Sequence, residues 1–150
     1  MSSTLPPRIE VPDRVLGRRI LTGSLRKTAL SVAEAIFFDG QPPPPDRVAW
    51  MCDELDEHLS CCGPRAGLVV SASLHAVSAF APTLVGRRPP FRRLEVQQRV
   101  KALQRMEKLP GAALAVLALK SLMCIIYYEH PDGVAFLGAD DHCLIDGEPK

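Results

Sequence analysis

The chain has 150 residues, which is enough for one domain with one hydrophobic core. Its 18 Lys and Arg residues nearly balance its 17 Asp and Glu residues. A chain so close to neutral has no global field that would draw it onto nucleic acid or an anionic membrane, and we expect no nucleic-acid partner.

The cysteines give a first indication of the compartment. There are five of them, an odd number, and no two are spaced as C-x-x-C. This pattern is typical neither of a disulfide framework nor of a zinc site, so we expect reduced thiols in the cytoplasm. Arg18 and Arg19 form a twin-arginine dipeptide, but no apolar export segment follows them. A periplasmic location is expected only if a partner carries the chain there.

The first half of the chain predicts an arm and two helices. Residues 1–20 contain three prolines and predict a loosely ordered N-terminal arm, and residues 21–150 predict a single helical domain. Apolar residues recur every three or four positions over 24–38, which predicts the first helix. Prolines 42–45 then form a stiff spacer. We favour a rigid link between helices over a polyproline ligand for a signalling domain.

The second helix is expected over residues 46–60, with one apolar and one acidic face. Its buried stripe is expected at Val48, Cys52, Leu55 and Leu59. Its outer face is expected to carry Asp53, Glu54, Asp56 and Glu57.

The third and fourth helices are separated by a second proline-rich break. The third is expected over 64–80, and the side chains expected to face inward are Leu68, Val69, Ala72, Ala76, Val77 and Phe80. The fourth is expected over 92–109. Segment 87–108 carries eight basic residues against two acidic ones, and Phe91 is its single aromatic residue. We interpret it as a solvated face, or one that pairs with the acidic second helix, and not as a phosphate-binding surface.

The last helix is the most apolar stretch. Between Ala112 and Tyr128 the only strongly polar residues are Lys120 and Ser121. Such a helix has no face for water, yet it is shorter than the roughly 20 residues that span a bilayer. We therefore predict no membrane span, but an all-α bundle of about five helices around this central, enclosed C-terminal helix, with proline-rich connections. A short helical turn at 131–137 and a closing tail follow.

Candidate chemistry is sparse. His58 with Cys61 and Cys62 could imitate a thiol–imidazole pair, but nothing nearby would orient the imidazole. Residues 140–143, Asp-Asp-His-Cys, could chelate a metal, although an anchored terminus is the stronger interpretation. The chain has no glycine-rich phosphate loop, no G-x-S-x-G and no H-E-x-x-H. We therefore expect a protein that is not an enzyme by itself and binds no cofactor or metal.

Several segments carry a family resemblance. They are Leu119-Lys-Ser-Leu-Met-Cys-Ile-Ile-Tyr-Tyr-Glu-His-Pro-Asp132, Phe136-Leu-Gly-Ala-Asp140, Thr28-Ala-Leu-Ser-Val-Ala-Glu-Ala-Ile-Phe37 and Pro45-Asp-Arg-Val-Ala49. Together they resemble the subunit 3 family of membrane-bound gluconate 2-dehydrogenase, which includes the small subunit of FAD-dependent glucose dehydrogenase. The resemblance covers about residues 24–143. The family's usual Gly-Tyr-Asp is Gly138-Ala139-Asp140 here, and the twin-arginine signal is missing.

The resemblance implies a non-catalytic accessory subunit. In such complexes the large subunit is a flavoprotein of the glucose-methanol-choline (GMC) class, which holds FAD and oxidises an alcohol carbon of a sugar or sterol, and a cytochrome subunit often takes the electrons. We expect the partner interface at Tyr127, Tyr128, Pro131 and Phe136, because tyrosines often dominate interfaces. The alternative is a stand-alone helical ligand-binding or regulatory protein, with a pocket between the third and fifth helices.

Overall fold

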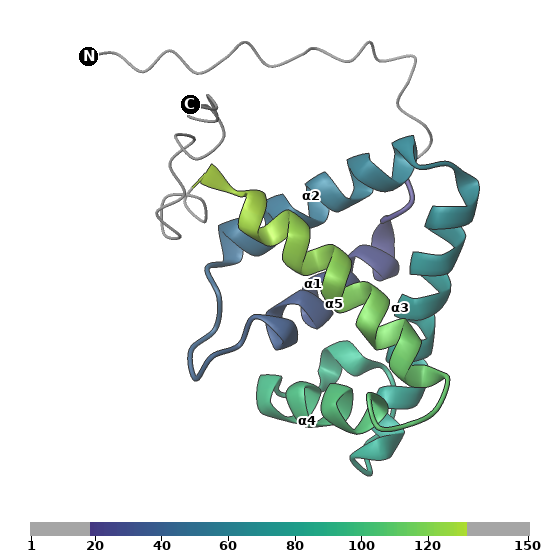
Figure 1. Ribbon diagram of the computed structural model, residues 1–150. Helices are drawn as coiled ribbons and strands as arrows, with labels where there is room; N and C mark the ends of the chain where they lie inside the picture. Colours follow the sequence, from purple (N-terminus) through teal and green to yellow (C-terminus); the bar gives the residue numbers. More distant parts are fainter. Residues whose placement is uncertain (1–18, 132–150) are drawn as a thin grey trace, which may run out of the picture.

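A computed structural model describes residues 19–131 (Figure 1). In this range the chain forms helices and no strand, which confirms the predicted all-α class and the number of helices. The elements are α1 (Gly23–Ile36), α2 (Pro45–Cys61), α3 (Pro64–Leu84), the 3₁₀ turn η1 (Phe91–Arg93), α4 (Val96–Met106) and α5 (Ala112–Glu129). The predicted turn after Pro131, Phe136 within it, and the 140–143 cluster lie outside the described residues.

Prolines set several helix boundaries. α2 and α3 each begin at a proline, where the missing N–H costs no intrahelical bond. The predicted fourth helix is wrong as a single element, because Leu94 and Glu95 adopt extended backbone between η1 and α4. Proline-rich connections join the helices as predicted.

α1 occupies the middle of the bundle. It packs against α2, α3, α4 and η1, and its side chains Ala29, Val32 and Ala33 are fully buried. Small residues let the neighbouring helices approach closely. The apolar stripe predicted for this helix is confirmed.

α5 is not enclosed by the other helices. It lies across α2 and α3, with a smaller contact to α4 (Figure 1). Val116, Leu119 and Met123 are buried, whereas Leu114, Leu117 and Ile125 on the other side are exposed. The expectation that α5 is central and covered all round is therefore wrong within residues 19–131.

The buried face of α3 also differs from the prediction. Val77 points inward as expected, but Leu68, Val69 and Phe80 are exposed. Val70, Ser73, Leu74 and Ala81 are buried instead. Since α3 is apolar on nearly every side, periodicity could not select the face. Packing against α1, α4 and α5 selects it.

Asp56 is buried, although it was expected on the outer face of α2. Its Oδ1 accepts hydrogen bonds from the backbone N–H groups of Ile20, at 2.8 Å, and Leu21, at 2.7 Å. Asp56 follows Cys52 by one helical turn, so both side chains face the interior. The carboxylate ties the segment before α1 to α2, so Ile20, the last residue of the predicted arm, is held in place.

Segment 87–108 was expected either to face solvent or to pair with the acidic face of α2. Among the described residues it pairs with α1 instead, through Arg99. Arg99 Nη1 contacts Glu34 Oε2 at 2.5 Å, and Arg99 Nε donates to the Leu94 carbonyl at 2.8 Å. The acidic face of α2 pairs instead through Asp53, which contacts Arg26 at 2.6 Å.

Asp56→Ala should lower the free energy of unfolding by about 2–3 kcal/mol, because two backbone N–H groups lose a charged acceptor. The matched control is Asp53→Ala on the same helix, which removes an exposed ion pair and should cost less than about 1 kcal/mol. Urea denaturation followed by circular dichroism measures both. Equal costs for the two variants would contradict the anchoring role of Asp56.

Candidate functional site

The candidate site is an exposed apolar surface on two neighbouring helices. In the described range, every large hydrophobic side chain that is exposed belongs to α3, to α5 or to the connection just before α5. We call the part of this surface shared by the two helices the α3–α5 face; it comprises Val69, Phe80, Leu109, Leu114, Leu117, Ile125 and Tyr128, whereas Leu68 lines a separate groove beside Ile20. Leu68 is 71% exposed and Leu114 is 70% exposed. Apolar patches that extend over neighbouring elements mark interaction sites.

Two hollows lie along the contact between α3 and α5. The larger, about 550 Å³, is lined by Phe80, Leu84 and Leu109 on one side and by Ala112 and Ala115 on the other. The smaller, about 410 Å³, lies between Val69 of α3 and Ala118 and Leu122 of α5. Both linings are mainly apolar, so these hollows can receive apolar side chains or a small apolar ligand.

By length and composition alone, α3 and α5 are also the two described helices that could cross a membrane. Core helices of soluble proteins pass the same test. Here both helices pack one side against the remaining helices and expose the other.

Three of the four residues expected at the interface are described, and they differ in exposure. Tyr127 is only 7% exposed and stacks on Phe37, with ring centroids 3.8 Å apart. Arg47 lies over the same ring at 4.1 Å and donates to the Tyr127 carbonyl at 3.1 Å. Since both groups stack on one ring, they occupy its opposite faces.

Two of the other expected interface residues, Tyr128 and Pro131, lie nearer to solvent. Tyr128 is 47% exposed, and its ring stands perpendicular to that of Tyr127. Pro131 is exposed. A cavity of about 340 Å³ beside Tyr128 is lined by Phe37, Asp39 and Arg47. Of the tyrosine pair, only Tyr128 thus presents its ring to a partner, and it lies at one end of the α3–α5 face.

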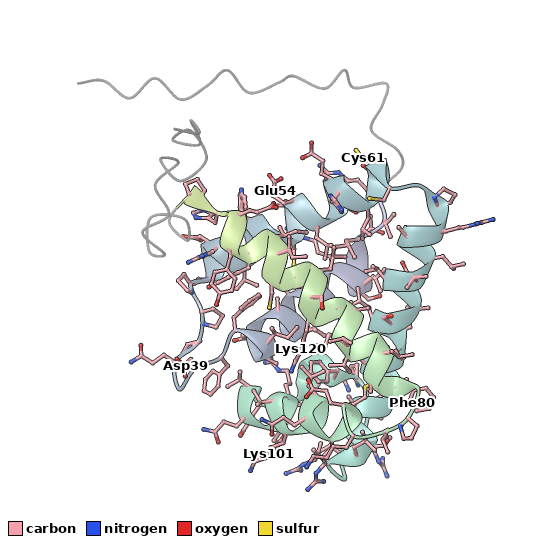
Figure 2. All side chains as sticks on the ribbon, viewed as in Figure 1. Asp39, Glu54, Cys61, Phe80, Lys101 and Lys120 are labelled. Atoms are coloured by element: carbon pink, nitrogen blue, oxygen red, sulfur yellow. The ribbon has the colours of Figure 1, made fainter. Side chains whose placement is uncertain are left out.

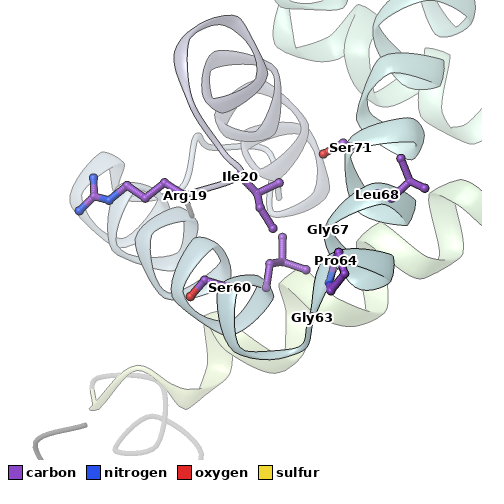
Figure 3. A pocket seen from close by; sticks show the side chains of 9 residues that line it. Arg19, Ile20, Ser60, Gly63, Pro64, Gly67, Leu68 and Ser71 are labelled. Carbon is purple, nitrogen blue, oxygen red and sulfur yellow. The ribbon is translucent and has the colours of Figure 1, made fainter. Parts of the chain in front are cut away.

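A further groove, of about 440 Å³, lies where α2 turns into α3 (Figure 3). Ile20 points toward Gly67 of α3, and a Cβ at Gly67 would collide with Ile20 Cδ1. Leu59, Pro64 and Leu68 complete an apolar lining. The groove holds no pair of groups suited to proton transfer or nucleophilic attack. The groove instead contains the side chain of Ile20, whose backbone N–H donates to Asp56.

The described residues bring together no metal-ligand set. No group of three His, Cys, Asp or Glu side chains meets in residues 19–131. Cys61 and Cys62 are exposed beside His58, and Cys52 is buried in the core. Burial raises the pKa of the Cys52 thiol to about 12, and burial also raises the pKa of the Cys124 thiol.

Neither a family model, nor a characterised protein, nor a solved structure matches this chain. The family resemblance therefore depends on the sequence segments quoted above.

The α3–α5 face was missed in the sequence because its α3 residues were expected to point inward. The sequence nevertheless contained a signal for an exposed apolar face. Two helices that are apolar on nearly every side carry more apolar surface than the other three helices can cover.

Tyr127→Ala should lower the free energy of unfolding by about 3–5 kcal/mol, since it removes a buried ring held between Phe37 and Arg47. Tyr128→Ala should cost less than about 1.5 kcal/mol because that ring is half exposed. Tyr127→Phe, which keeps the stacked ring, is the control. Thermal and urea unfolding measure all three, and a large loss for Tyr128→Ala alone would contradict this assignment.

Alkylation should separate the cysteines in the folded protein. At a pH of about 8, iodoacetamide should modify Cys61 and Cys62 well before Cys52, whose raised pKa keeps it a protonated thiol and whose burial blocks access. Increasing the pH to about 9.5 should leave Cys52 protected, because its pKa is about 12. Peptide mass spectrometry measures each site, with urea-unfolded protein as the control. Equal rates at Cys52 and Cys61 in the native protein would contradict the burial.

Proposed function

We propose that this chain is a non-catalytic accessory subunit that binds and stabilises a larger protein through the α3–α5 face. The observation that carries the proposal is the gathering of the large exposed hydrophobic residues onto two adjacent helices. α1, α2 and α4 expose no large hydrophobic side chain in the described range. Burial of such a face against a partner removes apolar area from water, at roughly 25 cal/mol per Å² before the costs of association.

The proposed partner is an FAD-dependent dehydrogenase of the GMC class that acts on an alcohol, sugar or sterol. Its support is the resemblance of segment 119–132 and the other quoted segments to the small-subunit family. The FAD would be held by the partner, and a cytochrome subunit could complete the complex. Ile125 and Tyr128 lie within the resembling segment and also on the α3–α5 face. We propose a cytoplasmic complex, in keeping with the free cysteines of the described range.

Charge placed in the middle of the face should abolish the complex. Leu114→Glu with Leu117→Glu should weaken binding at least tenfold, because the carboxylates would be desolvated against an apolar surface. The chain is co-expressed with a GMC-class flavoprotein from the same organism, and the affinity is measured by calorimetry. Thr22→Glu with Ser24→Glu, at exposed residues where α1 begins, is the matched control and should bind like wild type.

Circular dichroism and unfolding curves of both double variants establish that any loss arises at the interface. Tyr128→Ala should weaken the same complex less, since it removes one ring at the end of the face. Unchanged affinity of the Leu114 and Leu117 double variant would refute this docking surface.

The second candidate is a stand-alone ligand-binding or regulatory protein. It is favoured by the hollow of about 550 Å³ between α3 and α5, whose lining is mostly apolar. Size-exclusion chromatography of the purified chain discriminates between the two. A stable monomer that does not bind the flavoprotein would support the ligand-binding protein. Self-association that the flavoprotein reverses would support the accessory subunit.

A further inference from the structure

One end of the molecule carries a concentration of unpaired positive charge. Of the eight basic residues in segment 87–108, Arg99 is held by Glu34, and Arg105 donates to the Leu84 carbonyl. The other six are exposed, and their side chains form no ion pair or hydrogen bond within the described chain. We call these six the basic end: Arg87, Arg88, Arg92, Arg93, Lys101 and Lys108.

Little negative charge offsets the basic end. Within segment 87–108 the acidic residues are Glu95 and Glu107, and Glu107 already contacts Lys120 of α5. The chain as a whole is nearly neutral, so the excess is local. Its influence reaches about 8–10 Å at physiological salt, which is the range of a contact surface.

The basic end adjoins the α3–α5 face. Arg105 joins α4 to the end of α3 through the Leu84 carbonyl, and Lys108 immediately precedes Leu109, a member of the face. Leu84 and Leu109 line the same hollow as Phe80. Figure 2 shows Phe80 and Lys101 at the end of the molecule where α3 finishes and α5 begins. Tyr128 lies at the opposite end of α5.

We infer that the partner surface recognised by this chain is apolar at its centre and acidic along one rim, and that the basic end receives that rim. The inference rests on the proposed function and specifies the chemistry of the partner. Complementary charge at an interface rim accelerates encounter and excludes wrong orientations. Because the charge lies at one end only, it orients the partner's acidic rim toward the start of α5 and away from Tyr128.

The shape of the face favours a protein over a lipid bilayer as the occupant. The two hollows between α3 and α5 need protruding apolar side chains to fill them. A protein surface presents such side chains in fixed positions, and packing at interface centres matches that of protein interiors.

The test is the rate of association with the GMC-class flavoprotein, measured at about 50 mM and about 300 mM NaCl. For the wild-type chain the association rate constant should fall at least about tenfold between the two salt concentrations. Arg92→Glu with Arg93→Glu should lower the rate about tenfold at low salt and flatten its salt dependence, with little change in the dissociation rate. Arg19→Glu with Lys27→Glu, an equal charge change at exposed residues away from this end, should behave like wild type.

The outcomes separate this inference from the proposed function. If the wild-type chain binds at a salt-independent rate, or if the two double variants behave alike, the acidic rim is refuted and the accessory role stands. If the wild-type chain does not bind at all, the proposed function fails and the inference fails with it.

Sedimentation with phosphatidylcholine vesicles containing about one quarter phosphatidylglycerol tests the other source of negative charge, a membrane surface. Vesicle binding that the Arg92 and Arg93 variant abolishes, with partner association unchanged, would assign the basic end to a membrane surface and overturn the inference.

Discussion

The arrangement of the bundle follows from one constraint: two of its five helices are apolar on almost every side, and the other helices of residues 19–131 are too few to cover them. α3 and α5 each bury one side against the other helices. The small residues of α1 let it take the middle position, where a thicker helix would separate its neighbours. The surplus apolar surface of α3 and α5 therefore remains on the outside, on adjacent helices.

Polar contacts fix how the helices meet at the margins of this core. Asp56 holds the segment that leads into α1, Arg99 joins α4 to Glu34 of α1, and Arg47 joins α2 to the last turn of α5. Asp56 and Arg99 bond to backbone atoms or to an opposite charge, which offsets the cost of burying them, whereas the Nε of Arg47 is buried without a hydrogen-bond partner among the described residues. The contacts leave three different regions on the surface: an apolar face, a basic end and an aromatic end at Tyr128.

This division of the surface supports the proposed accessory role. The hollows along the α3–α5 face are lined mainly by apolar side chains, which suits them to receive apolar side chains of a partner. Ile125 and Tyr128 belong both to the exposed apolar face and to the segment that resembles the small-subunit family, so the proposed accessory role is supported at these two residues by burial and by sequence.

The sequence by itself determined the all-α class and the inward faces of α1 and α2. Those helices carry polar residues on one side, so Val32 and Leu55 could only point inward. Asp56 was predicted to face solvent because it is charged, although its position one turn after Cys52 places it on the buried side of α2. Only the tertiary structure decided which sides of α3 and α5 are exposed, and therefore where the α3–α5 face lies. A helix that is apolar all round has no periodicity from which its buried side could be predicted. Likewise, the sequence located the tyrosine pair, but Phe37 and Arg47, distant in the chain, decided that Tyr127 is buried and Tyr128 is not.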